Sequence, residues 1–542
     1  MGVTRERLIF VVGLVSALVV TIAWASPYPT LNQATYLLDP MQRAMPELFH
    51  RDWFVSGTPP YLPAYGWLAQ WLYVVDSEGT TSILIAHIVV NMATYAAIYW
   101  LVRALDGGWR AFAIVAAFMT ATKGLSMGGS YLIAGYFQPS SLSTLGWIVG
   151  MAALVRGRYL VCGLAVACAG ALHANFLVLG IGLFGLTALA RRDLALRDYA
   201  MLLAPQLVVL AWFLPSLLDA AGPSAEALWV LTNFHAPVHY DPARLSTWIG
   251  DVVGWQIGAY AGLYLLESTT AARVLWRFSL IACAIVVGSA LVIRYTSLDW
   301  LTQVRWSRIG PFGQLACAAL MASALVQQVV APRPLTFVAR VLVIIAFCVP
   351  LYYTGRYLHL IVAWWTVIVA AVLVVVTLLP WRRVARIGLG ALVAAAVGYA
   401  LWKSPRGAGF TTTPSASPDE LAMETWVRSH TSVDALFLAP PELQRFRVLA
   451  RRAVIADTKS PPLQPDLLVQ WYHRLCEMVR LPHAQTFQLV EARYPTLTPA
   501  ELEYVARSFG ADYIIVKVPV AFGYEPVFHN REFSIYRSRT DR

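Results

Sequence analysis

The amino-acid sequence predicts a mostly α-helical membrane protein: a bundle of about 13 transmembrane helices followed by a soluble α/β domain. Three observations support this fold class. Of the 542 residues, 58% are hydrophobic and only 13% are charged, whereas a soluble chain carries about 25% charged residues. Apolar runs long enough to cross a bilayer recur between residues 8 and 402. Beyond residue 402 the pattern becomes that of an ordinary globular domain.

The spans are predicted from apolar runs of roughly 20 residues, the length that crosses the hydrocarbon core as a helix. The first run is followed by further spans and ends in Ala25-Ser26-Pro27, a poor cleavage site, so we expect an anchor and not a signal peptide. The predicted spans are 8–25, 81–101, 111–130, 140–155, 159–172, 176–190, 199–218, 247–266, 274–294, 311–330, 335–352, 357–379 and 386–402.

The net charge of +11 is explained by topology. Residues 1–402 hold 24 basic and 15 acidic residues, so the transmembrane part of the chain, including its loops, accounts for nine of the eleven excess positive charges. Sixteen of those 24 basic residues fall in short loops on one side, which the positive-inside rule assigns to the cytoplasm. We therefore predict a multi-pass protein of the bacterial inner membrane with a cytoplasmic N-terminus and a periplasmic C-terminal domain. No nucleic-acid partner is expected.

The C-terminal part reads as a linker and a domain. Residues 403–418 are rich in Pro, Ser, Thr and Gly, which is typical of a linker between the transmembrane part, 1–402, and the periplasmic α/β domain, 419–542. The domain has enough residues, about 120, to bury its own core. Its predicted elements are helices at 419–430, 465–479 and 498–509, strands at Ala435–Leu438, Ala453–Ala456 and Tyr513–Val518, and a closing hairpin with Asn530 at the turn.

The first periplasmic loop, residues 26–80, is too long for a simple connector. It carries Asp39, Glu47 and Asp52 among aromatic residues that suit short helices lying on the membrane surface. A solvated loop whose carboxylates cap helices would have the same composition. Catalytic and structural interpretations of the three acids therefore both remain open at this point.

Cations are predicted on the same side of the membrane. Arg305 and Arg308 stand three residues apart and share a face if the segment is helical, and Arg356 follows in a later loop. Arginine binds phosphate through paired hydrogen bonds, and arginines outside the cytoplasm run against the topology preference. Snorkelling, or pairing with Asp299, is the alternative.

Histidines form a further candidate group. The string NFHAPVHYDP places His235, His239 and Tyr240 on the outer side, and LHAN places His173 at a hairpin tip. We expect these polar residues either to bind an acceptor or another part of a substrate, or to form a structural loop. A metal site at His235 and His239 is less favoured, because the loop contains proline and does not secure a helical spacing of the two rings.

Two parts of the sequence resemble a known superfamily. The string NQATYLLDP…HRDWFVSGTP, and the stretch ETWVRSHTSVDALFLAPPELQRFRVLARRAVIADTKSPP closed by ADYIIVKVP…PVFHNREFSIYRS, are similar to a subgroup of bacterial membrane proteins near the GT-C superfamily of membrane glycosyltransferases. The acid-bearing first loop, the many spans and the C-terminal α/β domain have the same arrangement. The resemblance covers nearly the whole chain.

The resemblance implies an inverting glycosyltransferase that moves a sugar from a polyprenyl-phosphate donor to a glycan, lipid or protein acceptor at the periplasmic face, in cell-envelope or exopolysaccharide assembly. It implies a carboxylate as general base, here Asp39 or Asp52, with Glu47 as third candidate. GT-C enzymes usually carry adjacent acids or a lone Asp in this loop, whereas Asp39 and Asp52 stand thirteen residues apart. The C-terminal domain is expected to position the acceptor or a partner.

The same resemblance implies that cations accept the charge of the departing phosphate. Arg305, Arg308 and Arg356 are the candidates. A divalent cation, Mg²⁺, Mn²⁺ or Ca²⁺, would bind carboxylate oxygens of Asp39 or Asp52, although nothing in the sequence demands a metal.

A transporter or flippase, or a non-catalytic scaffold of a polysaccharide pathway, is the alternative. Coupled transporters need ionisable groups within the membrane, and Asp251 is the one acid inside a predicted span. Nucleotide-driven chemistry is not supported, because the sequence contains no Walker motif, dinucleotide fingerprint or nucleophile elbow.

Overall fold

The structure is a computed structural model that describes residues 17–357, residue 387, and residues 416–517 and 522–539. Within the first range it leaves out residues 20, 23–24, 27, 31, 61, 219–223, 241–246, 297–300, 302–303 and 332–333. The predicted spans 357–379 and 386–402, most of 8–25, and nearly all of the linker lie outside the described residues.

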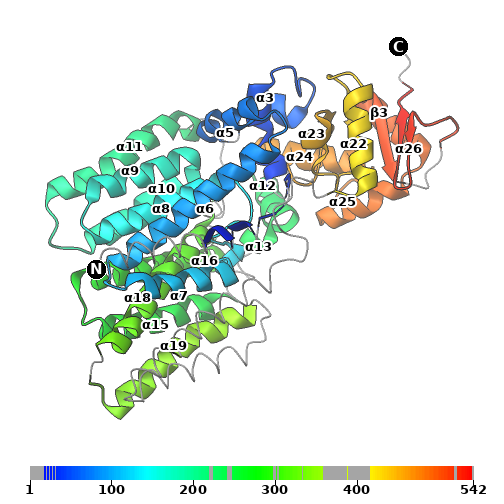
Figure 1. Ribbon diagram of the computed structural model, residues 1–542. Helices are drawn as coiled ribbons and strands as arrows, with labels where there is room; N and C mark the ends of the chain where they lie inside the picture. Colours follow the sequence, from blue (N-terminus) through cyan, green and yellow to red (C-terminus); the bar gives the residue numbers. More distant parts are fainter. Residues whose placement is uncertain are drawn as a thin grey trace.

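A bundle of helices forms the first part of the molecule (Figure 1). Ten of its helices coincide with ten predicted spans: α6 (Thr80–Arg103), α7 (Gly108–Thr122), α8 (Pro139–Val155), α9 (Tyr159–Leu172), α10 (Ala174–Leu189), α11 (Leu196–Leu218), α15 (Ile249–Leu265), α16 (Thr270–Tyr295), α18 (Gly310–Val330) and α19 (Phe337–Tyr357).

Length and composition qualify four described helices to cross a membrane: Thr80–Arg103, Leu196–Pro215, Thr270–Tyr295 and Trp306–Val330. The other apolar helices of the described ranges are shorter. The third predicted span, 111–130, was too long, because α7 ends at Thr122 and both Lys123 and Gly124 adopt positive φ angles that stop the helix. The residues up to Gln138 form an irregular segment around the short 3₁₀ helix η1 (Met127–Gly129).

Helix α18 is the centre of the bundle, since its apolar stretch is entirely buried. It is rich in small residues, which let neighbouring backbones approach closely. Gly262 of α15 lies against it, and a Cβ atom there would come within 3.1 Å of the backbone of Leu320. Close packing of small residues therefore holds the middle of the bundle together.

The first loop contains the short helices that the sequence predicted: α2 (Gln33–Tyr36), α3 (Leu38–Ala44), α4 (Trp53–Ser56) and α5 (Pro63–Val75). They share a small core that includes Leu37, Phe49 and Tyr65. Helix α5 leaves Trp67 and Trp71 about 60% exposed, an aromatic face that suits a membrane surface.

The C-terminal domain is a five-stranded sheet with helices packed against it. The strand order is β2-β1-β3-β5-β4; β1 pairs parallel with β2 and β3, and β5 pairs antiparallel with β3 and β4. The strands are β1 (Leu436–Leu438), β2 (Ala453–Val454), β3 (Tyr513–Lys517), β4 (Phe528–His529) and β5 (Phe533–Arg537). The helices are α22 (Pro418–His430), α23 (Phe446–Ala450), α24 (Pro465–Met478), α25 (Phe487–Arg493), η4 (Tyr494–Thr496) and α26 (Pro499–Phe509).

Sequence patterns located this domain's elements well. The three predicted helices correspond to α22, α24 and α26, and Asn530 makes the hairpin turn by accepting the backbone N–H of Glu532 and Phe533. Strand β2 is only two residues long, and the five-residue helix α23 was not predicted.

The first loop and the C-terminal domain lie together at one end of the bundle (Figure 1). Glu78 receives two hydrogen bonds of 2.7 Å from Arg428 of α22, and Arg51 donates to Asp512 at 2.6 Å. Between the bundle and this domain lie α12 (Ala225–Trp229), η2 (Val230–His235) and α13 (Pro237–Tyr240), and η2 contacts α24. The C-terminal domain thus packs against the first loop and against the segment that contains α12 and η2.

Candidate active site

Asp39 lies in α3 beside a small hollow in the first loop. Both carboxylate oxygens accept from Nε of Arg43, one turn further along the helix, at 2.9 and 3.0 Å. The hollow is lined by Tyr36 and Tyr65 among others, and the Asp39 side chain remains 24% exposed. Gly66 of α5 packs directly on the carboxylate, because any Cβ there would overlap Oδ2. The Asp39 carboxylate is therefore held in one orientation at the edge of a hollow.

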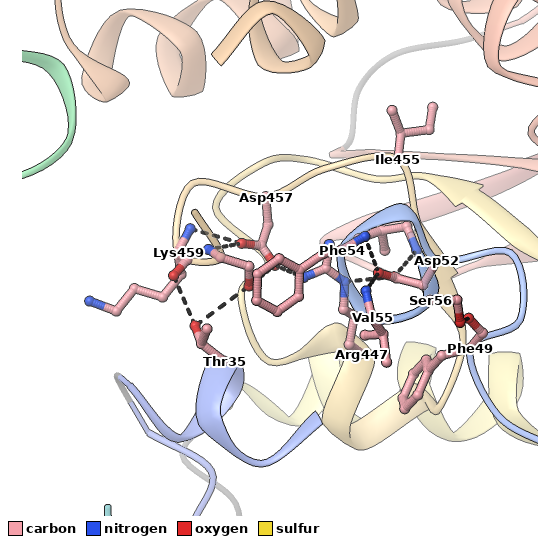
Figure 2. Close-up of polar contacts among 12 residues, drawn as sticks. Thr35, Phe49, Asp52, Phe54, Val55, Ser56, Arg447, Ile455, Asp457 and Lys459 are labelled. Carbon is pink, nitrogen blue, oxygen red and sulfur yellow. Dashed lines mark hydrogen bonds and ion pairs between the residues drawn. The ribbon is translucent and has the colours of Figure 1, made fainter. Parts of the chain in front are cut away.

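Asp52 is in a different situation, because its side chain is fully buried and both of its carboxylate oxygens have partners. Oδ1 accepts from the backbone N–H of Phe54 and Val55 at 3.1 Å, which caps α4. Oδ2 accepts from the backbone N–H of Val454 at 3.1 Å and lies 2.8 Å from Nε of Arg447 (Figure 2). This geometry favours the structural interpretation of Asp52 that the sequence left open.

The Asp52 contacts continue into the C-terminal domain. Arg447 of α23 donates from Nη1 to Asp457 at 3.0 Å, and Asp457 in turn accepts from the backbone N–H of Lys459 and Ser460 at 2.8 Å. Thr35 of α2 closes the arrangement by donating its hydroxyl to the carbonyl of Lys459 at 2.8 Å (Figure 2). This network thus joins the first loop to the C-terminal domain.

Arg305 directly precedes the short 3₁₀ helix η3 (Trp306–Ile309), and Arg308 lies within it. The Nε atoms of both guanidinium groups are buried and make no hydrogen bond within the described residues, and no carboxylate of those residues pairs with either group. Arg308 lies over the ring of Phe176, 5.5 Å from its centroid. The predicted alternative partner, Asp299, is outside the described residues. Within the described residues these are two buried cations without a carboxylate partner, an arrangement whose charge an anion would compensate.

The histidines surround these arginines. Nη2 of Arg305 lies 2.8 Å from Nδ1 of His239, which is also 2.6 Å from the carbonyl oxygen of Gly128; one nitrogen cannot accept and donate at once, so one of the two contacts is a hydrogen bond at any time. Burial, together with Arg305, lowers the pKa of His239 to about 3. His173 is buried at the tip between α9 and α10, and its pKa is also well below the usual value because of burial and the two arginines.

His235 connects this group to the C-terminal domain. Burial, with the charges of Lys459 and Arg305, lowers its pKa to about 4, and its ring packs edge-on against Trp471 of α24 with centroids 5.7 Å apart. Burial and the neighbouring Arg308 lower the pKa of Arg305 to about 10. At neutral pH the three histidines are therefore uncharged while Arg305 keeps its positive charge.

Tyrosines link the arginines to the hollow beside Asp39. Burial raises the pKa of Tyr36, against the influence of Arg308 and Arg305, and Tyr36 also lines the Asp39 hollow. Tyr240 packs edge-on against His239 with ring centroids 6.3 Å apart. Contacts thus join Arg305 to His239 and Tyr240 and Arg308 to His173 through Phe176, while Tyr36 lines the hollow beside Asp39.

One predicted residue, Glu47, is not brought into this region, because it is exposed in the turn after α3. The side chain of Arg356 is not among those that the structure describes, so the prediction for Arg356 is not tested. The sequence missed Lys459, Tyr36 and Arg447. Lys459 had one signal, because lysine occurs at only four positions in a chain with 41 basic residues.

A metal site at Asp39 or Asp52 fits these residues poorly. Each carboxylate is paired with an arginine, and the described part of the chain contains no group of three His, Cys, Asp or Glu side chains that could hold a metal ion. No step of the reaction is therefore assigned to a divalent cation.

The fold and the site define a helical-bundle protein whose first loop and C-terminal domain enclose a cationic region. A family model described as a domain of unknown function, DUF6798, matches residues 418–478, and no curated protein matches. The chain is similar to two crystal structures of ArnT from Cupriavidus metallidurans, each at 12% identity over 99% of this chain. The apo structure has a TM-score of 0.49 over 98% of that chain, and the structure bound to undecaprenyl phosphate has 0.46 over 99%.

Proposed function

We propose that this protein is an inverting membrane glycosyltransferase of the GT-C type, which passes a sugar from a polyprenyl-phosphate donor to an acceptor hydroxyl. The observation that carries the proposal is the pair Arg305 and Arg308, whose buried Nε atoms have no partner among the described residues, in the same region as the Asp39 carboxylate. A cationic seat near a carboxylate is what transfer from a sugar phosphate requires.

In this mechanism the acceptor oxygen attacks the anomeric carbon of the sugar. Its proton passes to the Asp39 carboxylate, which Arg43 and Gly66 hold in place. The bond from the anomeric carbon to the phosphate oxygen breaks on the opposite face, and the phosphate leaves with the electron pair. Arg305 and Arg308 stabilise the charge that develops on the phosphate. Attack from the side opposite the leaving group inverts the anomeric configuration.

The neutral histidines suit the sugar or the acceptor. An uncharged imidazole both donates and accepts hydrogen bonds, as sugar hydroxyls do, so His173, His235, His239 and Tyr240 are assigned to substrate binding. We place the site at the periplasmic face, following the arginine distribution, and the reaction in cell-envelope or exopolysaccharide assembly.

Transfer from a radiolabelled polyprenyl-phosphate sugar, measured with the purified protein in liposomes, tests the proposal. We expect Asp39→Asn to lower kcat at least about 100-fold, the range of a lost general base, while donor binding is kept. Arg305→Gln and Arg308→Gln should weaken donor binding. Arg294→Gln, an exposed arginine at the end of α16, is the control and should leave both quantities unchanged. Normal transfer by Asp39→Asn would overturn the assignment of the base.

A further inference from the structure

Lys459 belongs to the C-terminal domain but lies against the first loop. The hydroxyl of Thr35 donates to its carbonyl oxygen at 2.8 Å and lies 3.5 Å from the hydroxyl of Ser460. The lysine side chain extends away from the Asp457 carboxylate (Figure 2). Its ammonium group makes no hydrogen bond or ion pair with any residue that the structure describes.

Lys459 shares its surroundings with the arginine pair. Burial lowers the pKa of Lys459, and Arg305 acts in the same direction, whereas Asp457 opposes them. Contacts lead from the turn that carries Lys459 to Arg305. Trp471 donates to the carbonyl oxygen of Asp457 at 2.8 Å and packs against His235 with ring centroids 5.7 Å apart, and His239, four residues further on, lies 2.8 Å from Arg305. A half-buried ammonium group in the same surroundings as buried guanidinium groups is unfavourable unless an anion neutralises them.

Hydrogen bonds and ion pairs hold the backbone of the turn that contains Lys459. Asp457 accepts the N–H groups of both Lys459 and Ser460, Arg447 bonds to Asp457, and Asp52 of the first loop bonds to Arg447. The side chains of Arg447 and Asp52 are at most 2% exposed. The three buried charged side chains of Asp52, Arg447 and Asp457 therefore hold this turn in place. Lys459 is the most exposed residue of the turn, and its ammonium group has no partner among the described residues.

We propose that the C-terminal domain supplies part of the donor site: the ammonium group of Lys459 binds the phosphate of the lipid donor together with Arg305 and Arg308. Asp52, Arg447 and Asp457 are positioning residues that hold this lysine. The inference rests on the proposed function and gives the C-terminal domain a role in donor binding, whereas the sequence analysis expected it to position the acceptor or a partner.

Binding of farnesyl phosphate, a soluble short-chain probe, to the full-length protein in phosphatidylcholine nanodiscs tests the inference by calorimetry. Lys459→Ala should raise Kd about tenfold, the loss expected for one charge-assisted contact, and Lys459→Arg should bind nearly as well as the wild type. Lys517→Ala is the matched control, since Lys517 is a lysine of the same domain that pairs with Glu442; its Kd should not change.

The outcomes separate the inference from the proposed function. Unchanged binding by Lys459→Ala, while Arg305→Gln binds weakly, would overturn the role of Lys459 and leave the glycosyltransferase proposal standing. Equal weakening by Lys517→Ala would also overturn it, because the effect would then be a general one of domain charge. If inorganic phosphate binds as tightly as farnesyl phosphate, the lipid donor is wrong and both proposals fall.

A double-mutant cycle tests the positioning network. Asp457→Asn keeps an oxygen that can accept the N–H groups of Lys459 and Ser460, but it puts an N–H donor in place of the oxygen that accepts from Arg447. The turn should therefore be held less firmly, and farnesyl phosphate binding through Lys459 should weaken. If it acts in that way, Asp457→Asn should add almost nothing to Lys459→Ala. Additive losses would show that Asp457 does not act through Lys459 and would overturn this part of the inference.

Discussion

Replacement of Asp52 by asparagine separates its two interpretations, because the change keeps the size of the side chain and removes its charge. If the amide oxygen keeps the cap of α4, the amide N–H group points at two other donors, Nε of Arg447 and the N–H of Val454. Loss of one partner of a buried ion pair costs about 3–5 kcal/mol. Since Arg447 keeps its bond to Asp457, we expect a cost near the lower limit, about 3 kcal/mol.

Hydrogen exchange measured by mass spectrometry is the assay. A cost of about 3 kcal/mol corresponds to a loss of protection of about 100-fold where exchange proceeds by local opening, and the loss should be confined to peptides covering 52–56 and 446–460. Asp512→Asn is the control, because its pair with Arg51 is 32–40% exposed. Surface pairs contribute at most about 1 kcal/mol, so protection should fall less than about fivefold.

Transfer assays complete the test. Asp52→Asn should raise the KM for the donor, because Lys459 is held less firmly, and should keep kcat at saturating donor. If Asp52→Asn leaves exchange unchanged and removes kcat, Asp52 is the base and the structural assignment is wrong.

Two further predictions concern packing and pH. Gly66→Ala should lower kcat about 10- to 100-fold, because the new Cβ displaces the Asp39 carboxylate; Gly182→Ala, where a Cβ meets nothing within 4 Å, is the control, and normal transfer by Gly66→Ala would contradict the role of Asp39. The folded-state pKa values of His235 and His239 are lowered to about 4 and about 3. As the pH falls below about 6.5, these histidines therefore become protonated in the unfolded chain before they do so in the folded protein. Stability should therefore fall between pH 6.5 and 4 by about 1–2 kcal/mol per histidine at pH 5, and thermal unfolding of His235→Gln should show a smaller fall. If the stability of His235→Gln falls as much as that of the wild type, protonation of His235 does not cause the loss of stability.

The sequence predicted the helices of the bundle well where apolar runs ended in charged or turn residues. It failed at 111–130, because composition alone cannot separate a span from an irregular apolar segment. There the left-handed residues Lys123 and Gly124 end α7 eight residues before the predicted limit, and backbone conformation of this kind leaves no apolar signal. The short helix α23 was missed for a related reason, since five residues show no helical period.

The site was predicted in part. Arginines on the predicted outer side stood out because they run against the topology preference, and histidines stood out as a group in the outer loops; the structure brings Arg305 and His239 together. Asp39 and Asp52 could not be distinguished, because their difference lies in partners that are distant in sequence. Lys459 was out of reach for the same reason: its contact with Thr35 spans 424 residues, and no local pattern encodes such a pairing.

The network around Asp52 also orders events during synthesis. Asp52 and Val454 are 402 residues apart, so nearly the whole bundle is made while the first loop still lacks the groups that neutralise it. Asp52 can therefore make its contacts with Arg447 and Val454 only after the C-terminal domain has been synthesised. The burial of this first-loop carboxylate thus depends on the last part of the chain to be made.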